Sequence, residues 1–184
     1  ALRRDLTPTH ISAQTQPHTL NMWRYLPLLP MTETAHIPPL HVGWTPLIPA
    51  PRLAAAFGLR EIWLKDDGRN PTGSLKDRAS AMVVGRAQQL GVKVITTAST
   101  GNAAAALAGL CASVGMRAVI FVPAKAPSAK IAQLLVYGAT VLLVDGTYDD
   151  AYALSVQASA EYGWYCRNTG MNPYTTEGKK TAAL

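Results

Sequence analysis

From residue 53 onward, apolar and polar positions follow periods typical of helices and strands. Between Lys76 and Leu90 the apolar residues recur at helical spacing, whereas Ala118–Val122 is a continuous apolar run short enough for a strand. Glycine directly follows most of the expected helices, as is common at a helix C-terminus. The expected helices are 53–57, 76–90, 102–114, 129–137 and 148–162, and the expected strands are 61–65, 93–97, 117–122, 140–144 and 164–167.

This order of elements predicts an α/β fold. Strands that alternate with helices form parallel βαβ units, with helices on both faces of open sheets. The helix at 102–114 is nearly all small and apolar, which indicates a buried helix. Its N-terminus then lies at the carboxyl end of strand 93–97, where open α/β sheets bind ligands and where exposed N–H groups favour an anion. A capped helix start without a ligand explains the same residues equally well.

The first 51 residues are predicted to be irregular. They hold nine of the 13 prolines, and each proline fixes φ and removes a backbone donor. We therefore expect an arm that wraps the domain, without a continuous helix or sheet. Contact with a second subunit is an alternative role for this segment. The residues expected to anchor the arm to the body are Trp23, Tyr25, Leu26, Leu28 and Leu29.

Composition narrows the class of partner. The chain has 184 residues, of which 48% are hydrophobic and 15% charged, values that suit a globular α/β protein. The net charge of +6 comes from scattered basic residues, so an anionic ligand explains it as well as nucleic acid, and no nucleic-acid partner is expected. No apolar run approaches the ~20 residues of a membrane span, so no membrane role is expected. The two cysteines, Cys111 and Cys166, have no metal-ligand spacing, so we expect no metal site and a reducing, cytoplasmic compartment.

Lys76 is the candidate reactive residue. Asn70-Pro71 and Gly73 are turn signals, so Lys76 lies where a loop enters a helix. The positive end of a helix disfavours an ammonium, and desolvation would lower its pKa further and free the amine as a nucleophile for Schiff-base chemistry. A surface lysine paired with Asp77 explains the spacing as well. No glycine-rich nucleotide motif follows a strand and no histidine follows His41, so neither nucleotide binding nor a Ser-His-Asp triad is expected.

Several motifs resemble those of one enzyme family. Pro71-Thr72-Gly73-Ser74-Leu75-Lys76-Asp77-Arg78 resembles the lysine motif of the fold type II pyridoxal phosphate (PLP) enzymes, although Leu75 stands where that family often has phenylalanine. Ala98-Ser99-Thr100-Gly101-Asn102 resembles the family's loop beside the cofactor ring. Within the family, segments 43–47, 64–70 and 176–181 are similar to the threonine synthases. The resemblance runs from about residue 23 to the last residue.

The resemblance implies roles for individual residues. Lys76 would hold PLP as a Schiff base and act as general acid and base, and Asn102 would hydrogen-bond the ring oxygen of the cofactor. Ser99, Thr100 and Gly101 would bind the α-carboxylate of the substrate. The candidates to bind the substrate phosphate are Lys65, Arg167, Asn168, Asn172 and Lys179. Loop hydrogen bonding and helix capping are alternative roles for these residues.

The activity implied by the resemblance is a PLP-dependent carbon–oxygen lyase reaction. It would convert O-phosphohomoserine and water to threonine and phosphate, with a phosphorylated amino acid as substrate and a homodimer as the complete enzyme. A threonine or serine dehydratase on the same fold is an alternative, because it needs no phosphate pocket. A non-catalytic ligand-binding relative is an alternative from a different class.

The resemblance also implies a division into parts. Residues 1–51 would form the arm, 52–92 the first part of a larger PLP domain, 93–166 a smaller α/β domain, and 167–184 the return into the larger domain. The chain stops inside an expected helix that begins near Thr176, and it contains neither the family's glycine-rich loop for the PLP phosphate nor its hydroxyl for the pyridine nitrogen. We therefore expect a fragment whose C-terminal half is absent.

Overall fold

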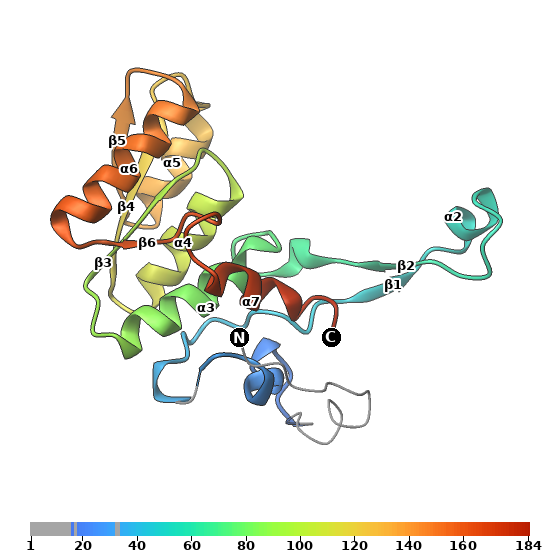
Figure 1. Cartoon of the computed structure of the whole chain (residues 1–184). Helices are drawn as coiled ribbons and strands as arrows, with labels where there is room; N and C mark the ends of the chain where they lie inside the picture. Colours follow the sequence, from blue (N-terminus) through green and yellow to red (C-terminus); the bar gives the residue numbers. More distant parts are fainter. Residues whose placement is uncertain (1–15, 17, 32–33) are drawn as a thin grey trace.

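A four-stranded parallel sheet forms the body of the protein. The computed structural model describes residue 16, residues 18–31 and residues 34–184. The strand order is β5-β4-β3-β6, and each neighbouring pair is parallel (Figure 1). The predicted α/β class with a parallel sheet is confirmed. The strands are β3 (Val94–Ala98), β4 (Arg117–Pro123), β5 (Thr140–Val144) and β6 (Tyr165–Cys166).

Helices cover both faces of this sheet, as predicted. Side chains of β4 alternate between two apolar clusters, because successive residues of a strand point to opposite faces. Ile120 packs in the cluster that contains the buried residues of α4 (Asn102–Ser113), whereas Phe121 packs in the cluster that contains buried residues of α6 (Tyr148–Tyr162). The helix α5 (Ser128–Val136) lies beside α4 and contacts the edge strand β5.

Two helices that are far apart in sequence cross at very short range. These are α3 (Lys76–Gln89) and α7 (Tyr174–Lys180), which lie against each other beside the sheet (Figure 1). A Cβ added at Gly178 of α7 would lie 2.1 Å from the backbone oxygen of Arg78 in α3. Only glycine therefore permits this crossing, which brings the last turn of α7 to the first turn of α3.

A buried ion pair holds the start of α3 to neighbouring segments. The Arg78 side chain is 1% exposed, and its Nε lies 2.8 Å from Oδ2 of Asp67 in the short 3-10 helix η3 (Asp67–Arg69). Arg78 Nη1 also donates to the backbone oxygen and hydroxyl of Thr181, at 3.2 and 3.1 Å, and Nη2 donates to the Thr45 hydroxyl at 3.2 Å. The guanidinium thus joins segments from the N-terminal, central and C-terminal parts of the chain.

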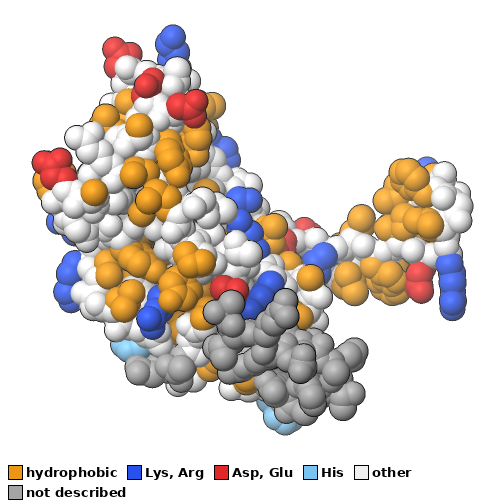
Figure 2. Space-filling view, viewed as in Figure 1, with side chains coloured by type: hydrophobic (Ala, Val, Ile, Leu, Met, Phe, Trp, Pro, Cys, Tyr) orange, Lys and Arg blue, Asp and Glu red, His pale blue; other side chains and the backbone are white. Residues whose placement is uncertain are grey.

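An antiparallel hairpin projects from this body. It consists of β1 (Leu47–Pro49) and β2 (Trp63–Lys65), with α2 (Pro51–Ala56) at its tip (Figure 1). The expected strand at 61–65 is therefore shorter and lies outside the parallel sheet, and it pairs with a short strand at the end of the segment that was expected to be irregular. Apolar side chains of the hairpin remain uncovered (Figure 2). The exposed ones are Leu47, Ile48, Leu53, Phe57, Leu59, Trp63 and Leu64.

The described part of the N-terminal segment packs on the body through a short irregular helix. This 3-10 helix, η1 (Met22–Leu28), is kinked at Tyr25 and contains Pro27, and a second one, η2 (Thr34–His36), follows. Four of the five expected anchors are buried, and Tyr25 is partly buried, which confirms their anchoring role. Residues 1–15 of the expected arm lie outside the described residues. Among the described residues, no helix is long and apolar enough to cross a bilayer.

Candidate active site

Lys76 is the first residue of α3 and is partly buried. The preceding turn contains Gly73 at φ +82°, a left-handed conformation that glycine adopts without strain. Asp77, which is fully buried, accepts hydrogen bonds from the Thr72 backbone N–H at 2.8 Å and from the Thr72 hydroxyl. Burial raises the pKa of Asp77, although the Thr72 hydrogen bonds act in the opposite direction. The Asp77 carboxylate therefore forms hydrogen bonds within the lysine loop and is not a surface ion-pair partner for Lys76.

Lys179 and Arg167 lie close to Lys76. Lys179, in the last turn of α7, has its pKa lowered first by burial and then by the positive charges of Lys76 and Arg167. Like charges disfavour protonation, and the direction of this shift agrees with positive charge near Lys179. The α3–α7 crossing at Gly178 explains how Lys179 reaches the first turn of α3.

Arg167 is a buried cation with an unused donor. Its side chain is 1% exposed, with Nε donating to the Ser80 hydroxyl at 3.3 Å and Nη1 to the Thr169 hydroxyl at 3.5 Å. Nη2 is buried and makes no hydrogen bond among the described residues. Burial lowers the pKa of Arg167 to about 10. No ion pair joins it to a carboxylate in the described part of the chain, so an anion would supply both the missing hydrogen bond and the missing countercharge.

A cavity of about 170 Å³ lies beside Arg167, at the carboxyl edge of β3. Thr97, Ala98 and Ser99 line it on one side, and residues 167–170 line it on another. Its third side consists of Tyr148 and Tyr152, from the first two turns of α6. Neither tyrosine was predicted from the sequence as a site residue. Their position immediately after β5, whose carboxyl end meets the same sheet edge as that of β3, is the signal that could have identified them.

Asn168 lines this cavity, and Asn172 joins the end of β6 to the start of α7. Asn168 Oδ1 accepts from the Ala98 N–H and the Thr97 hydroxyl, both at 2.9 Å, and its Nδ2 donates to the Ser155 hydroxyl at 2.9 Å. Asn172 Nδ2 donates to the Cys166 backbone oxygen at 2.9 Å, and its Oδ1 accepts from a backbone N–H at the start of α7. Both amides are engaged in internal bonds, so they position Arg167 and α7.

The Ser99–Asn102 loop joins β3 to the N-terminus of α4. The Ser99 hydroxyl accepts from the Gly101 N–H at 3.2 Å, and Gly101 is the N-cap residue of α4. Asn102 is exposed, and its amide makes no hydrogen bond among those of the described residues. The loop therefore presents backbone N–H groups and free side-chain polar groups at the ligand-binding edge of the sheet.

Lys65 lies apart from this group. Its Nζ donates to the Thr45 backbone oxygen at 2.6 Å, and it lines a different cavity, of about 270 Å³, together with Arg78. Burial and the charge of Arg78 lower the pKa of Lys65. The structure thus brings Arg167, Asn168 and Ser99 to one cavity and leaves Lys65 at another.

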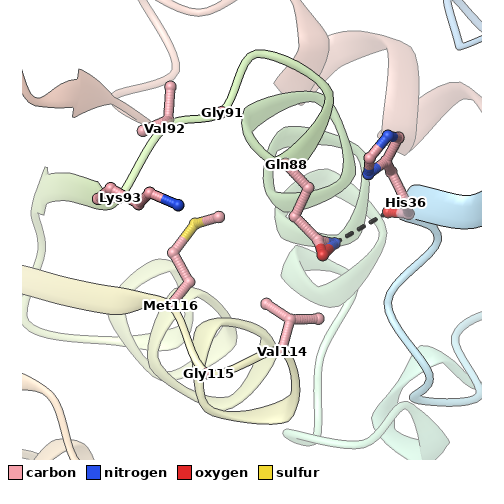
Figure 3. Close-up of a pocket in the computed structure, with 8 residues that line it drawn as sticks. All are labelled: His36, Gln88, Gly91, Val92, Lys93, Val114, Gly115 and Met116. Atoms are coloured by element: carbon pink, nitrogen blue, oxygen red, sulfur yellow. Dashed lines mark hydrogen bonds between the residues drawn. The ribbon is translucent and has the colours of Figure 1, made fainter.

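A further cavity, of about 250 Å³, lies at the opposite edge of the sheet (Figure 3). It is formed where α3 and α4 end and where β3 and β4 begin, and Gln88 donates across it to the His36 backbone oxygen at 3.0 Å. None of the residues that the sequence identified as site candidates lines this cavity. Helix C-termini carry partial negative charge, so this edge does not favour an anionic ligand.

The donor set fits pyridoxal phosphate in the part of the site that this chain forms. The primary amine of Lys76 can react with the aldehyde carbon of the cofactor, and the free amide of Asn102 can hydrogen-bond the ring oxygen of the cofactor. The buried guanidinium of Arg167, which has no carboxylate partner among the described residues, suits a negatively charged ligand nearby. These observations agree with the resemblance noted in the sequence.

Comparisons with known proteins identify the family. The family model described as "Pyridoxal-phosphate dependent enzyme" matches residues 39–184. The chain is 41% identical over 166 residues to the threonine synthase of Methanocaldococcus jannaschii, covering 90% of this chain and 41% of the relative. It is 42% identical over 162 residues to the threonine synthase of Synechocystis sp., covering 87% of this chain and 42% of the relative. The chain therefore spans less than half the length of these curated relatives.

Solved structures share the fold. Diaminopropionate ammonia lyase from Escherichia coli, in complex with an aminoacrylate-PLP azomethine intermediate, matches 76% of this chain and 42% of its own, with a TM-score of 0.67 and 23% identity. Threonine deaminase isoform 2 from Solanum lycopersicum matches 75% of this chain and 38% of its own, with a TM-score of 0.69 and 24% identity. Both are fold type II enzymes, and at these identities they establish the fold alone. The chain belongs to the family of pyridoxal-phosphate dependent enzymes, and pyridoxal phosphate is its cofactor.

Proposed function

We propose that the enzyme containing this chain converts O-phosphohomoserine and water to threonine and phosphate. The observation that carries the proposal is the buried Arg167 guanidinium, which borders the cavity and forms no ion pair with a carboxylate among the described residues. A phosphate dianion satisfies such a group, whereas the neutral hydroxyl of a threonine or serine substrate leaves its charge uncompensated. The threonine synthases at 41% and 42% identity support the same reaction.

Lys76 is proposed as the residue that binds the cofactor aldehyde and moves protons. Bound PLP supplies an electron sink that stabilises negative charge on the substrate carbons. Lys76 lies at the start of α3, where the Asp77–Thr72 bonds fix the loop and hold the amine in place. An amine held in this position can accept a proton from one substrate carbon and return it to another.

The loop at 99–102 is proposed to orient the substrate and the cofactor. Ser99, Thr100 and Gly101 bind the α-carboxylate through hydroxyl and N–H donors, aided by the positive end of α4. Asn102 binds the cofactor ring oxygen through its free amide. For the substrate phosphate, the structure supports Arg167, which borders the cavity, whereas Lys179 does not line it. It supports Asn168 and Asn172 as residues that position Arg167 and α7, and it gives Lys65 no place beside Arg167.

Three narrower features of the complete enzyme are also proposed. The substrate is a phosphorylated amino acid, the assembly is a homodimer, and the compartment is the cytoplasm. The free thiols of Cys111 and Cys166 suit a reducing compartment. The uncovered apolar side chains of the hairpin suit a segment that is covered by other parts of the complete enzyme.

The test is turnover of O-phosphohomoserine by the complete enzyme, with phosphate and threonine both quantified. We expect equal amounts of the two products. Arg167→Lys keeps the positive charge but loses the planar fork, so we expect kcat/KM for the phosphorylated substrate to fall at least about ten-fold. Deamination of threonine without phosphate release would reject the proposal and favour the dehydratase.

A further inference from the structure

Tyr148 and Tyr152 occupy one face of α6 and both point to the cavity beside Arg167. They are four residues apart, a spacing that places side chains on the same face of a helix. Their ring centroids are 6.4 Å apart, and both residues line the cavity with Arg167, Asn168 and Thr169. The two phenols therefore form the wall that faces the guanidinium side of the cavity.

The phenol hydroxyls have unused hydrogen-bonding capacity. Tyr148 Oη reaches the Ala98 backbone oxygen at 3.5 Å, which is at the outer limit for a hydrogen bond. Tyr152 Oη has no hydrogen bond among those of the described residues, and it would lie 3.8 Å from a Cβ placed on Gly170. Tyr148 also lies near enough to Arg167 for the two groups to interact electrostatically. Two phenol hydroxyls and the charge of the Arg167 guanidinium thus lie beside one small cavity.

Packing does not explain Tyr148, whereas Tyr152 also packs against the apolar cluster that contains Phe121. Tyr148 is 51% exposed, so its ring gains little from burial, and at this position of α6 a smaller polar residue would serve equally well as the first residue of the helix. The cavity of about 170 Å³ is many times larger than the ~10–15 Å³ that one water molecule needs, so it has room for a phosphate-sized group.

We propose that Tyr148 and Tyr152 bind the phosphate group of the substrate and determine its selection over unphosphorylated amino acids. Each phenol donates one O–H to a phosphate oxygen, and the buried Arg167 guanidinium beside the cavity supplies positive charge. This inference rests on the proposed function, because it assigns further ligands to the same anion site. A phosphate monoester has three terminal oxygens, which is enough to accept from both phenols at once.

The first test measures binding of inorganic phosphate to this chain by isothermal titration calorimetry. We expect Tyr152→Phe and Tyr148→Phe each to raise the dissociation constant about ten-fold, since each removes one hydrogen bond to a charged group. Tyr162→Phe is the matched control, because Tyr162 lies at the far end of the same helix and stacks on Trp164 at 5.0 Å. We expect it to leave the dissociation constant unchanged.

Arg167→Lys separates failure of this inference from failure of the proposed function. Weaker phosphate binding in Arg167→Lys, with unchanged binding in both tyrosine variants, would overturn the tyrosine assignment and keep the anion site. No phosphate binding by the unchanged chain, or binding unaffected by all three variants, would overturn both. Circular dichroism of each variant establishes that it is folded before its binding is measured.

A second arm identifies the source of the phosphate. The Lys76→Ala chain cannot bond covalently to PLP, so PLP can compete with inorganic phosphate only through its own phosphate group. We expect PLP to leave the phosphate affinity within about two-fold, whereas O-phosphohomoserine displaces inorganic phosphate in a Tyr152-dependent manner. Displacement of inorganic phosphate by PLP would assign the cavity to the cofactor and overturn the proposal that the tyrosines select the substrate.

Discussion

Gly178→Ala is expected to weaken the contact between α7 and α3. The added Cβ would lie 2.1 Å from the backbone oxygen of Arg78, 2.8 Å from its carbonyl carbon and 3.0 Å from Cα of Ala79. All three are backbone atoms of a helix, so no side-chain rotation relieves the overlap, and α7 must move away by more than 1 Å to reach ordinary contact at about 3.4 Å. Overpacking of this kind costs about 1–3 kcal/mol, and the loss of backbone contact brings the expected cost to the upper end. Alanine gains only about 1 kcal/mol in helix propensity, so the net change is destabilising by about 2 kcal/mol.

Urea unfolding followed by circular dichroism measures this change. Gly170→Ala is the control, because its Cβ would meet only the Tyr152 hydroxyl at 3.8 Å, an ordinary contact. We expect the unfolding midpoint of Gly178→Ala to fall clearly below those of the parent and of the control. A Gly178→Ala chain as stable as the parent would refute the close crossing, and with it the argument that the crossing brings Lys179 to Lys76.

Three further predictions concern the lysine loop and the buried ion pair. Borohydride reduction in the presence of PLP is expected to place a pyridoxyl mass on Lys76 in a peptide map, and a label that persists in Lys76→Ala would assign the reaction to another lysine. Asp77→Ala removes both acceptor oxygens for the Thr72 N–H and hydroxyl, so we expect a loss of about 1–3 kcal/mol in urea unfolding, and no loss would contradict the role of Asp77 in the loop. Burial raises the pKa of Asp67, but hydrogen bonds from Arg78 and Thr45 and the charge of Arg78 outweigh it, so the net pKa is lowered. A lowered folded-state pKa contributes stability that is present above the unfolded pKa of ~3.9 and is lost as the pH falls through the folded pKa. We therefore expect Asp67→Asn to abolish this part of the acid dependence of unfolding. The same substitution breaks the buried ion pair with Arg78 and is expected to cost about 3–5 kcal/mol at pH 7.

The parallel sheet and its helices follow from local patterns in the sequence. The strand β5 and the helix α6 have the predicted bounds, and the ends of α3 and α4 differ from the prediction by one residue. These elements are recognisable because their apolar residues recur with one period and because a glycine follows each helix. The helix N-terminus at 102 was expected at the carboxyl edge of β3, and it lies there.

The hairpin and the ion pair could not be predicted in the same way. The strand β2 pairs with β1, which lies in a proline-rich segment. The spacing of apolar residues within one strand does not indicate which other strand will pair with it. Arg78 follows Lys76 in the motif, but its burial depends on Asp67, Thr45 and Thr181, which are up to 103 residues away. Long-range partners of this kind arise from the tertiary fold, which the sequence pattern of one element does not contain.

The same reasoning explains why the anion site was only partly found. Arg167 was selected by motif resemblance, yet its chemical value comes from its burial without a carboxylate partner, which only the packing of this residue against Ser80 of α3 reveals. Lys179 acquires its role from the crossing at Gly178, since one turn of α7 in another orientation would point its ammonium to solvent. Cations gathered in this way repel one another, and a fold accepts that cost where an anion will offset it. Lys76, Arg167 and Lys179 together therefore support a phosphorylated substrate more strongly than any one of them does alone. The reason is that mutual repulsion among the three charges is costly unless an anionic ligand offsets it.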